Sequence, residues 1–477
     1  IVLYSTGGTY DFIHALGVKA IRVESLTNYP SILGGRVKTL HPKVFGGILA
    51  RRDEPGDIDE MTRYEIPEID LVIVDLYPFE ETVRLVDDEQ EIIEKIDIGG
   101  ISLIRAGAKN YKDVVIVSNS SQYDSLLALL KEKNGYTSLE DRRFFAAQAF
   151  QTSSNYDTAI FKYFNREAGI DVLRESINTS FRLRYGENPH QKGVFYGDHQ
   201  QVFDKLHGKE ISYNNFLDID ASLGLLDEFD ETTFVIVKHN NACGVASRKN
   251  PSDAWKDALA CDPVSAYGGV IACNVQITAI EAAEIDKLFF EIIIAPGFSE
   301  DALNILMQKK NRIILRRKDK AGNLYNYRSV LNGVLWQEKD NSTEMAGDME
   351  TVTSKSPTPS ELEDLVFANK IVKHSKSNAI VLAKNLQLCA SGIGQTSRVD
   401  ALKQAVEKAR SFGFDLKGAV LASDAYFPFA DSVEIAYKAG ITAIVQPGGS
   451  VRDRDSIEFC SANDVAMVFT GKRHFKH

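Results

Sequence analysis

The sequence predicts an α/β protein with an N-terminal parallel-sheet domain and a larger C-terminal region that contains a duplicated unit. In the N-terminal part, short apolar runs such as 71–74 and 114–117 alternate with longer helical stretches. This alternation is typical of a parallel sheet with helices on both faces. In the C-terminal part, several short segments recur in the same order, as a duplicated unit would require.

The composition is that of an ordinary globular protein. The chain has 477 residues, 44% hydrophobic and 25% charged, enough for about three domain-sized units. Its formal net charge of −11 argues against general binding of nucleic acid or anionic membrane. No apolar run approaches the roughly 18 residues of a membrane helix. The five cysteines show no CxxC or CxxH spacing, so we expect no zinc site, no disulfide framework and a reducing cytoplasm.

The first expected domain covers residues 1–165. The apolar residues 1–4 predict a strand, and the sequence starts with neither an initiator Met nor a signal peptide. We therefore expect the first elements of this domain to precede Ile1. Polar or glycine-rich turns follow two expected strands, at 5–9 and at 77–79. Ligands bind at the carboxyl ends of strands in such sheets, which makes both turns candidate sites.

A less regular stretch at 166–180 predicts a linker before the C-terminal region, 181–477. The two expected lobes cover about 181–340 and 358–477, and the polar segment 338–357 predicts a surface connection between them. A helix start is expected at its end. Thr358 can act as N-cap, Pro359 suits the first helical position, and Glu361 completes a capping box.

Three pairs of segments indicate the duplication. Lys238-His239 follows the apolar run 234–237, and Lys373-His374 follows 371–372, so each pair is expected at a strand end. The segments 267–270 and 294–297 are matched by 417–420 and 445–448. A cation beside an imidazole can transfer protons next to an anionic ligand. A core or capping histidine is the alternative for each pair, and one copy could serve chemistry while the other serves binding.

Three N-terminal motifs are candidate binding elements. Residues 5–9 offer backbone N–H groups to a phosphate, although a Gly-Gly pair is also common in tight turns. The segment 34–42 gathers cations beside glycines and is either an anion site or a solvated basic loop. After Asp97, a helix carries Arg105 and Lys109 on one face. An exposed face is the simpler interpretation, and an Asp97–Lys109 acid/base pair with a lysine pKa lowered by burial is the functional one.

Three C-terminal motifs complete the candidates. The segment 184–191 is dense in hydrogen-bonding side chains, and 392–398 combines glycines with an arginine. The segment 424–429 places an acid beside an aromatic wall, which suits a flat heteroaromatic ligand, although aromatic side chains more often belong to the core.

With these motifs in order, the chain resembles the bifunctional purine-biosynthesis family that joins AICAR transformylase to IMP cyclohydrolase. The matching strings run from about residue 4 to the C-terminus. They include STGGT, GGRVKTLHPKVFGGILARR, DLYPFE, IDIGGISLIRAGAKN, RYGENPHQK, GKEISYNNFLDIDA, VKHNNACGVA, CDPVSAYGGVIA, VKHSKSNAI, GIGQTSRVD, LASDAYFPF, QPGGSVRDRDSI and VFTGKRHFKH.

The resemblance implies a methylglyoxal-synthase-like, doubly wound parallel sheet followed by two duplicated cytidine-deaminase-like lobes. It implies formyl transfer from 10-formyltetrahydrofolate to AICAR, then cyclodehydration of formyl-AICAR to IMP. No tightly bound cofactor and no metal are expected, because the folate is a co-substrate. The resemblance also implies a cytoplasmic homodimer whose transformylase sites form between subunits.

The resemblance assigns site residues to both activities. For the cyclohydrolase, it implies catalytic roles for Lys109, Asp97, Tyr77 and Lys38, and nucleotide binding by Thr6, Gly7, Gly8, Thr9, Arg36, Thr39, Val74, Asp75 and Ile98. For the transformylase, it implies catalysis by Lys238, His239 and Asn378, with His239 as proton acceptor. Nucleotide contacts fall on Arg184, Tyr185, Gly268, Glu291, Arg398, Tyr426 and Arg473, and folate contacts on Val399, Asp431, Ser450 and Val451.

The chain departs from the family pattern at three places. A phosphate loop of the type Ser-x-x-x-Lys-x-Gly, which the family has upstream of STGGT, is absent because the sequence starts at Ile1. Asp75 stands where Asn is usual, and Tyr426 where Phe is common. Two alternatives to the bifunctional enzyme follow. One is a transformylase whose N-terminal domain is impaired by loss of that loop. The other is a non-catalytic nucleotide-binding regulator, against which Lys238-His239, Asn378 and Arg398 argue together.

Overall fold

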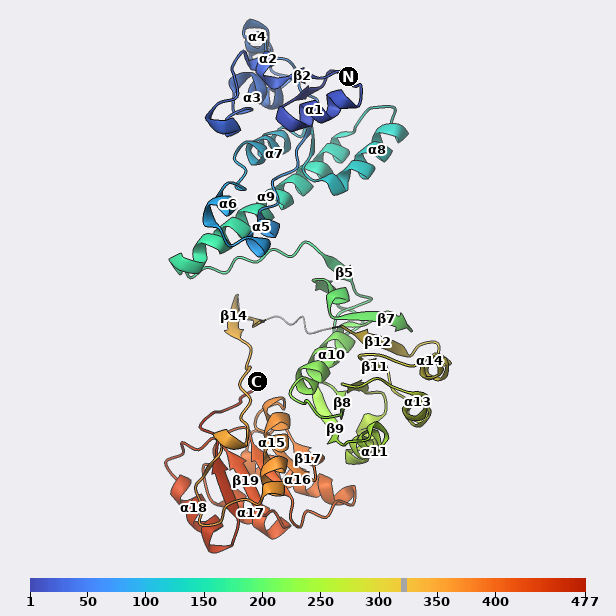
Figure 1. Ribbon diagram of the computed structural model, residues 1–477, viewed down its shortest axis with the longest axis vertical. Coiled ribbons are helices and arrows are strands. Elements are labelled where there is room, and N and C mark those ends of the chain that lie inside the picture. The colour runs from blue at the N-terminus through green and yellow to red at the C-terminus, as the bar shows by residue number, and fades with distance from the viewer. Residues whose placement is uncertain (319–323) are drawn as a thin grey trace. The chain divides into compact units, whose positions relative to one another are not determined.

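The computed structural model describes residues 1–318 and 324–477. The chain divides into two compact units, an N-terminal unit of residues 1–178 and a C-terminal unit of residues 179–477. Each is described by itself below. In Figure 1 the N-terminal unit runs from blue to teal, and the C-terminal unit from green to red.

The N-terminal unit alternates short strands with helices. Its strands are β1 (Tyr4–Ser5), β2 (Ile21–Arg22), β3 (Leu71–Ile73) and β4 (Val115–Val117). Its helices are α1 (Gly7–Ala15), α2 (Val23–Thr27), α3 (Pro42–Leu49), α4 (Pro55–Arg63), α5 (Phe79–Leu85), α6 (Glu89–Ile93), α7 (Gly99–Lys109), α8 (Tyr123–Glu132) and α9 (Leu139–Ala168), with short 3₁₀ turns η1 (Leu33–Gly35) and η2 (Ser120–Gln122).

The strand pairs of the N-terminal unit are parallel, as the apolar runs predicted. β1 pairs with β2, and β3 pairs with β4 in the register Leu71↔Val115. The strands are shorter than the runs, since β1 begins only at Tyr4 and β3 ends at Ile73. Apolar side chains of α3, α7 and α9 pack with those of β3 and β4 in one core, which includes Ile48, Val72, Ile104, Ile116 and Ala149.

The long helix α9 closes the N-terminal unit. It begins with a capping box, in which Asp141 N donates to Ser138 Oγ and Ser138 N donates to Asp141 Oδ2. It ends at Gly169, whose φ of 61° is the left-handed conformation that favours glycine. The helix therefore extends past the start of the linker predicted at 166–180, and the irregular part of that stretch lies between Gly169 and β5 (Ser180–Arg182).

The C-terminal unit has two lobes of matching element order. The first contains β6 (Val194–Tyr196), η3 (His199–Gln201), β7 (Phe203–His207), α10 (Tyr213–Leu226), β8 (Thr233–Lys238), β9 (Asn241–Ser247), α11 (Pro251–Cys261), α12 (Pro263–Ala266), β10 (Val270–Cys273), α13 (Ala279–Ile285), β11 (Ile292–Ala295), α14 (Glu300–Leu306) and β12 (Ile313–Arg317). The second contains η4 (Ala346–Asp348), β15 (Glu350–Thr351), α15 (Pro359–Lys373), β16 (Ile380–Lys384), β17 (Gln387–Gly392), α16 (Arg398–Ser411), β18 (Val420–Ser423), α17 (Asp431–Ala439), β19 (Ala443–Gln446), α18 (Asp453–Ala462) and β20 (Ala466–Phe469).

One mixed sheet of 12 strands joins the two lobes. Its order is β15-β20-β19-β18-β16-β17-β9-β8-β10-β11-β12-β7. Each half contains an antiparallel hairpin, a parallel trio of strands and an antiparallel edge strand, and the halves meet where β17 pairs antiparallel with β9. The two halves are therefore the duplicated unit that the repeated segments predicted.

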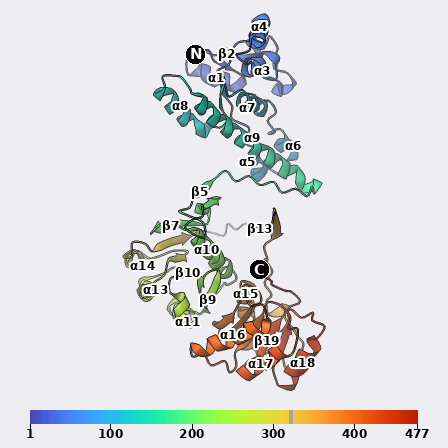
Figure 2. The same ribbon diagram turned by 180° about the vertical axis from the view of Figure 1, so that it is seen from behind.

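Helices cover both faces of this sheet. Side chains of α10 and α15 pack on one face in a core that spans both lobes. On the other face, α11, α13 and α14 cover the first lobe, and α16, α17 and α18 cover the second. Strand residues alternate between these cores, for example Val235 with Ile236 and Val381 with Leu382, because successive side chains of a strand point to opposite faces. Figures 1 and 2 show each lobe as a three-layer α/β/α sandwich.

The structure corrects one of the three segment pairings on which the duplication was inferred. The expectation of a strand end at Lys373-His374 is wrong, because Ile371 and Val372 lie in helix α15, the counterpart of α10. In the β8–β9 hairpin, His239 and Asn240 form the turn with φ values of 53° and 64°. Their counterparts in the β16–β17 hairpin are Asn385 and Leu386, with φ values of 52° and 53°. The segments 267–270 and 417–420 lead into β10 and β18, and the segments 294–297 and 445–448 lie at the ends of β11 and β19. Each of these two pairs therefore occupies equivalent positions in the two lobes.

The segment between the lobes is more than the predicted surface connection. The helix start was predicted correctly, with Thr358, Pro359 and Glu361 forming the capping box of α15. Upstream, however, β15 adds an edge strand to the large sheet and Glu344 is buried. Before it, the hairpin of β13 (Tyr325–Val330) and β14 (Gly333–Glu338) is a separate two-stranded sheet whose residues are all exposed.

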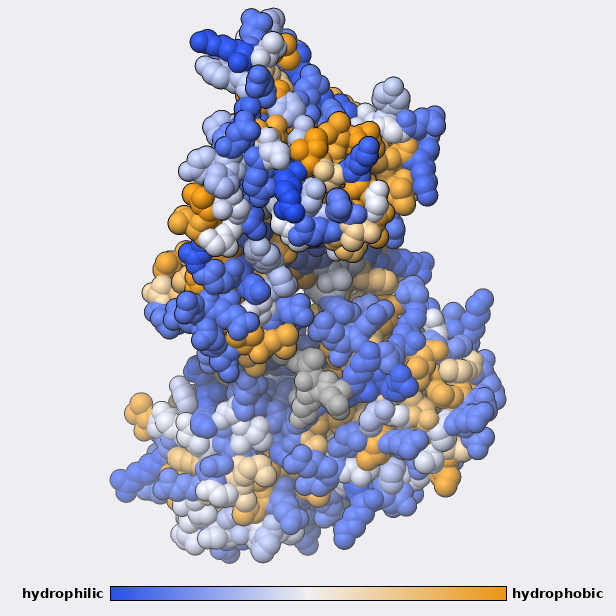
Figure 3. All heavy atoms as spheres, turned by 45° about the horizontal axis from the view of Figure 1, so that its top comes forward, coloured by the Kyte–Doolittle hydropathy of each residue, from blue (hydrophilic) through white to orange (hydrophobic). Residues whose placement is uncertain are grey.

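Polar side chains cover most of the face in Figure 3, with apolar ones gathered in small patches. Among the described residues, no helix has the length and apolar character that a membrane crossing requires. The five cysteines are all buried and unpaired, and burial raises the pKa of the Cys243 thiol to about 12.

Candidate active sites

In the N-terminal unit, Lys38 connects two motifs that are far apart in sequence, 5–9 and 34–42. A Cβ placed on Gly35 would lie 2.8 Å from Lys38 Cε, and one on Gly7 would lie 3.8 Å from Lys38 Nζ. Gly7 begins α1, whose first turn carries no acidic residue and whose N-cap, Thr6, makes no side-chain capping bond. The ammonium group of Lys38 and this helix N-terminus both favour a bound anion.

Asp97 lies at the neighbouring N-terminus of α7. Its Oδ1 accepts a hydrogen bond from Gly100 N at 2.6 Å, and its own N–H donates to Tyr156 Oη at 2.8 Å. Burial raises the pKa of the Asp97 carboxyl, although Gly100 N and the charge of Lys38 oppose the shift. Thr39 borders the same turn, since a Cβ on Gly99 would lie 3.2 Å from its Oγ1. The structure thus brings together Lys38, Thr39, Gly7 and Asp97.

Two other predicted nucleotide contacts are engaged with protein groups. Arg36 pairs with Glu94. Asp75 accepts hydrogen bonds from Ser120 N at 2.6 Å and from Tyr123 Oη at 2.7 Å. The bond to Asp75 raises the pKa of Tyr123 to about 12. The carboxylate at position 75 therefore ties the turn after β3 to the turn after β4.

The Asp97–Lys109 acid/base pair is not supported by the structure. Gly99 and Lys109 are the two ends of α7, and a rise of 1.5 Å per residue separates them by about 15 Å. Lys109 is exposed, as is Arg105, whose guanidinium donates to Ser153 Oγ at 3.0 Å. Arg105 and Lys109 thus lie on an exposed helix face, and the catalytic role of Lys109 stays a prediction. Of the remaining predicted contacts, Tyr77 and Ile98 are exposed beside the strand and helix ends, and Val74 N donates to Val117 O.

In the first lobe of the C-terminal unit, Lys238 and His239 lie at the end of β8. His239 is exposed in the hairpin turn, and Lys238 Nζ donates to Tyr267 O at 2.7 Å. Asp218 of α10 supports this turn, because its Oδ1 accepts from Asn240 N at 2.6 Å. Burial raises the pKa of Asp218, while Asn240 N and the nearby His239 oppose the shift. Asp218 was not among the predicted residues, although NNFLDID lies within a quoted motif.

Gly268 and Glu291 lie next to this turn. Gly268, with φ of 75°, precedes β10, and Glu291 precedes β11. The Glu291 carboxylate accepts from Lys209 Nζ and from Asn215 Nδ2, each at 3.1 Å. Lys209 and Asn215 were also missed as individual residues. Arg184 and Tyr185 follow β5, where the guanidinium carbon lies 5.6 Å from the centre of the tyrosine ring.

The second lobe has a cavity of about 530 Å³ at the end of β18. It gathers six predicted site residues from separate parts of the chain, Asn378, Arg398, Val399, Tyr426, Asp431 and Arg473. Thr396, Ser397, Ala425, Pro428, Phe429 and Phe475 complete the lining. The predicted aromatic wall is present in Tyr426 and Phe429, whereas Phe427 belongs to the core.

A buried ion pair fixes Arg398 at this cavity. Its Nη2 donates to Asp424 Oδ1 at 2.6 Å and its Nε donates to Ser423 Oγ at 2.9 Å. The side chains of Arg398 and Asp424 are 8% and 0% exposed. The second oxygen of Asp424 accepts from Ser377 Oγ at 2.6 Å. Next to Ser377, Asn378 donates one amide hydrogen to Gln395 O at 2.9 Å, which leaves its second hydrogen available to a ligand.

The His239 turn and the second-lobe cavity lie on the same edge of the 12-stranded sheet. Lys238 and Gly268 mark the N-terminal end of β10, and Asp424 follows the C-terminal end of β18. Each step along β10-β8-β9-β17-β16-β18 is antiparallel. Because the number of steps is odd, β10 and β18 run in opposite directions. The N-terminal edge of one therefore coincides with the C-terminal edge of the other.

Two predicted folate contacts lie in the loop before α18. Ser450 N donates to Asp453 Oδ2 at 2.9 Å, and the side chain of Val451 is fully exposed. They do not line the second-lobe cavity, whereas the other two folate candidates, Val399 and Asp431, do.

The second Lys-His pair takes part in a structural network. Lys373 Nζ donates to Glu228 Oε1 at 2.7 Å and to Ser342 O at 2.8 Å, and His374 Nε2 lies 2.9 Å from Glu228 Oε1. Burial opposes ionisation of Glu228, but the hydrogen bonds from His374, Lys373 and Thr343 outweigh it and lower its pKa to about 2. Burial also lowers the pKa of His374. This pair therefore ties the first lobe to the segment 342–343, as the alternative of a buried structural histidine anticipated.

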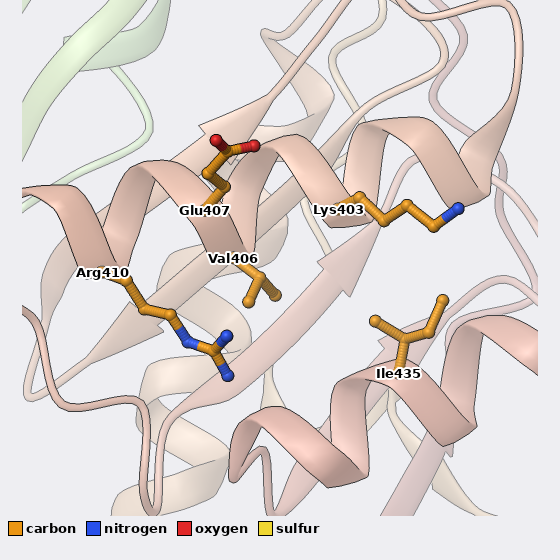
Figure 4. A pocket seen from close by; sticks show the side chains of 5 residues that line it. All are labelled: Lys403, Val406, Glu407, Arg410 and Ile435. Atoms are coloured by element: carbon orange, nitrogen blue, oxygen red, sulfur yellow. The ribbon is translucent and has the colours of Figure 1, made fainter.

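A second hollow of about 320 Å³ lies between α16 and α17, away from these groups. Lys403, Val406 and Arg410 face Ile435 across it, and Glu407 points away in Figure 4. It contains neither an aromatic wall nor any predicted site residue, so it is distinct from the candidate active sites.

A lysine at a helix N-terminus beside a half-buried carboxyl, and a separate cavity with arginines and an aromatic wall, are typical of an α/β enzyme that handles flat, anionic small molecules. Residues 107–408, more than half of the chain, match the family described as AICARFT/IMPCHase bienzyme, and residues 1–102 match the MGS-like domain. The chain belongs to the AICARFT/IMPCHase bienzyme family. Both parts of the predicted fold class are thereby confirmed.

Similar proteins cover nearly the whole chain. A bifunctional purine biosynthesis protein PurH from Bacteroides thetaiotaomicron is 63% identical over 473 residues, 99% of this chain and 93% of that protein. A protein of the same name from Persephonella marina is 47% identical over 490 residues, 100% of this chain and 95% of that protein. A solved structure, the crystal structure of ForH, is 36% identical with a TM-score of 0.31, covering 34% of this chain and 84% of that chain.

Proposed function

We propose that the C-terminal unit transfers a formyl group to AICAR and that the N-terminal unit closes the product to IMP, the two activities of the bienzyme family. The chain is accordingly a bifunctional enzyme of purine biosynthesis. The observation that carries the assignment of residues is the second-lobe cavity, where six residues predicted from separate motifs line one space. No observation favours the alternative of a transformylase with an impaired N-terminal domain.

The cavity has the chemistry that a purine precursor needs. Arg473 brings positive charge for the phosphate, and Arg398 adds a guanidinium group whose charge Asp424 balances. Tyr426 and Phe429 offer aromatic surface for the heteroaromatic ring. Asp424 holds Arg398 in position through a buried ion pair, so that little side-chain freedom remains to be lost on binding. Asn378 offers an amide hydrogen to the formyl oxygen of 10-formyltetrahydrofolate, the proposed co-substrate.

His239 is the proposed proton acceptor for formyl transfer. The AICAR amine attacks the formyl carbon of the folate and loses its proton to His239. The C–N bond to the folate then breaks, and the departing folate nitrogen takes up a proton, so that tetrahydrofolate leaves as a neutral amine. The exposed position of His239 in a rigid turn leaves its ring free to reach a substrate. Lys238 is held by Tyr267 O and supplies positive charge beside that ring, which stabilises the oxyanion that develops on the formyl oxygen.

In the N-terminal unit, ring closure requires mainly a held conformation and proton movement. The carboxamide nitrogen of formyl-AICAR attacks its own formyl carbon, and water leaves, so both reacting groups belong to one molecule. Gly7, Gly8, Thr9, Lys38 and Thr39 form the proposed phosphate site around the α1 N-terminus. Asp97, whose pKa burial raises, and Tyr77 are the proposed proton carriers. Lys109, about 15 Å along α7 from Gly99, has no proposed part in the same proton transfer.

A homodimer would complete the transformylase site. His239 belongs to the first lobe and the cavity to the second, and none of the hydrogen bonds or ion pairs found among the described residues joins His239 to the cavity lining. The exposed β13–β14 hairpin supports an association with a second copy, because it presents Tyr327, Leu335 and Trp336 to solvent. We propose that His239 of one protomer faces the second-lobe cavity of its partner.

The experiment that tests this function measures both products. With AICAR and 10-formyltetrahydrofolate supplied, formyl-AICAR and IMP are quantified separately. His239→Asn should lower formyl transfer by about 10²–10⁴, the usual contribution of a general base, and spare IMP formation from supplied formyl-AICAR. Asp97→Asn should do the reverse. His207→Asn and Asp87→Asn are the matched controls, and formyl transfer that survives His239→Asn would exclude His239 as the base.

The shared site is tested by mixing subunits. A heterodimer of a His239→Asn chain and an Arg398→Gln chain would contain one site with both changes and one with neither, if each site draws on two protomers. Co-expressed, differently tagged chains should then recover formyl transfer that neither homodimer shows. A heterodimer as inactive as both homodimers would place His239 and Arg398 of the same chain in one site.

A further inference from the structure

The last residues of the chain bring two side chains to the second-lobe cavity. Arg473 and Phe475 line it, with the guanidinium carbon 4.3 Å from the centre of the phenyl ring. The residue between them, His474, is only 4% exposed. Alternate side chains of this segment thus have opposite environments, one set at the cavity and one inside the protein.

His474 is held on both sides of its ring. Its Nδ1 lies 2.7 Å from Asp340 Oδ2, and its Nε2 lies 2.7 Å from Glu344 Oε2. A carboxylate only accepts hydrogen bonds, so both ring nitrogens of His474 donate, and the imidazole is in its doubly protonated, positively charged form. Glu344, with a side chain that is 1% exposed, is itself held by Asn369 Nδ2 of α15 and by Ser342 Oγ.

Backbone bonds hold the same segment against the cavity wall. His474 N donates to Asp424 O at 3.0 Å, Lys476 N donates to Ser377 Oγ at 3.1 Å, and Ser377 N donates to Lys476 O at 3.0 Å. Asp424 fixes Arg398, and Ser377 in turn donates to the second oxygen of Asp424. The terminal segment and Arg398 therefore share one support.

We propose that His474 is a positioning residue for formyl transfer: clamped between Asp340 and Glu344, it holds Arg473 and Phe475 in the cavity. This inference rests on the proposed function, in which Arg473 contacts the nucleotide. A clamp on the residue between two ligand contacts orders both before substrate arrives, which reduces the ordering cost of binding.

The clamp makes nucleotide binding depend on pH. The carboxylates of Asp340 and Glu344 and the backbone carbonyl of Asp424 face His474 directly. Two cations lie close to these carboxylates: Lys472 is 3.7 Å from Glu344, and Lys373 of α15 is near Asp340. The Asp424 carboxylate is neutralised by Arg398. Although burial lowers it, hydrogen bonds to Asp340 and Glu344 raise the pKa of His474 above its usual value. A raised pKa means that the clamp is intact below the ordinary histidine pKa and is lost as pH rises through the folded value.

The test separates substrate binding from turnover. His474→Gln should raise the KM for AICAR by about tenfold, the worth of a charged hydrogen bond, with a smaller change in kcat. Asp340→Asn is a milder second variant, because Asp340 is 45% exposed. It should move the rise in KM to lower pH, which a purely structural role would not do. His207→Gln, in edge strand β7 at the opposite end of the sheet, is the matched control.

The proposed function and the His474 clamp are refuted by different results. A wild-type chain that transfers no formyl group would refute the proposed function on which the clamp rests. A wild-type chain that does so, together with variants whose KM and pH profile match wild type, would refute the clamp alone. Thermal unfolding of the C-terminal unit, which contains Asp340 and His474, reports whether each variant is folded, and Asp340→Asn decides the question if His474→Gln does not fold.

Discussion

Asp424→Asn removes one charge from the buried ion pair beside the second-lobe cavity. Asp424 is fully buried and accepts from Arg398 Nη2 and Ser377 Oγ, each at 2.6 Å. Asparagine preserves the volume and one acceptor oxygen, so the change tests the charge. The Arg398 side chain, 8% exposed, would remain in place without its counter-ion.

The expected loss of stability is large. Breaking a buried pair by removing one partner costs about 3–5 kcal/mol, because the remaining charge is uncompensated. The retained oxygen can still accept from Ser377, so we expect the lower end, about 3 kcal/mol. An unfolding entropy of about 2.1 cal/mol/K per residue amounts to about 0.6 kcal/mol/K for the unit Thr179–His477, so a loss of about 3 kcal/mol lowers the Tm of the C-terminal unit by roughly 5 °C.

The assay uses the two units of one chain as mutual controls. Thermal unfolding is followed together with inactivation of formyl transfer and of IMP formation from supplied formyl-AICAR. Formyl transfer should be lost at lower temperature in Asp424→Asn, and the KM for AICAR should rise because Arg398 loses its support. Inactivation of ring closure should stay at the wild-type temperature, since Asp424 lies in the C-terminal unit.

A matched control removes a charge from an exposed pair in the same lobe. Arg454 and Glu458 of α18 are 87% and 63% exposed, and such pairs contribute about 0–1 kcal/mol. Glu458→Gln should therefore leave Tm nearly unchanged. If Asp424→Asn behaved like Glu458→Gln, the buried pair would not be stabilising the cavity wall, and the reasoning above would fail.

Two further predictions concern packing and acid stability. A Cβ on Gly392 would lie 1.8 Å from Ala401 O in the backbone of α16, so Gly392→Ala should destabilise the C-terminal unit by at least about 1–3 kcal/mol. Gly56→Ala is the control, because nothing lies within 4 Å of its new Cβ, and it should cause no such loss. Equal Tm values for the two variants would contradict this prediction. The pKa of Glu228, lowered to about 2 in the folded chain from 4.5, means that its contribution to stability is present above pH 4.5 and is lost as pH falls toward 2. The stability difference between wild type and Glu228→Gln, measured by denaturation at a series of pH values, should therefore shrink below pH 4.5, and a constant difference would show that the charge of Glu228 is irrelevant.

Local signals predicted several elements correctly. The capping box at Thr358 and Glu361 specifies a helix start by groups three residues apart. The runs around 71–74 and 114–117 became parallel strands because each was too short and too apolar for an amphipathic surface helix. The repeated segments before β10 and β18 revealed the duplication for a similar reason, since a short motif carries its own turn geometry.

Pairing Lys238-His239 with Lys373-His374 failed because a short apolar run does not distinguish a strand from a buried helix end. Ile371 and Val372 lie at the end of a 15-residue helix whose start was itself predicted. The left-handed turn residues His239-Asn240 and Asn385-Leu386 are the equivalent positions, and their side chains share no chemistry that a comparison of motifs could detect.

The sequence by itself determined the alternation of strands and helices, the duplication and, through its motifs, the family. Only the tertiary structure decided which candidates meet. It separated Asp97 from Lys109 along α7, engaged Asp75 with Tyr123, and placed Arg398 and Arg473 at one cavity. The physical reason is that caps, turns and periodicity act over a few residues, whereas a site on a sheet edge depends on the order and direction of strands from distant parts of the chain.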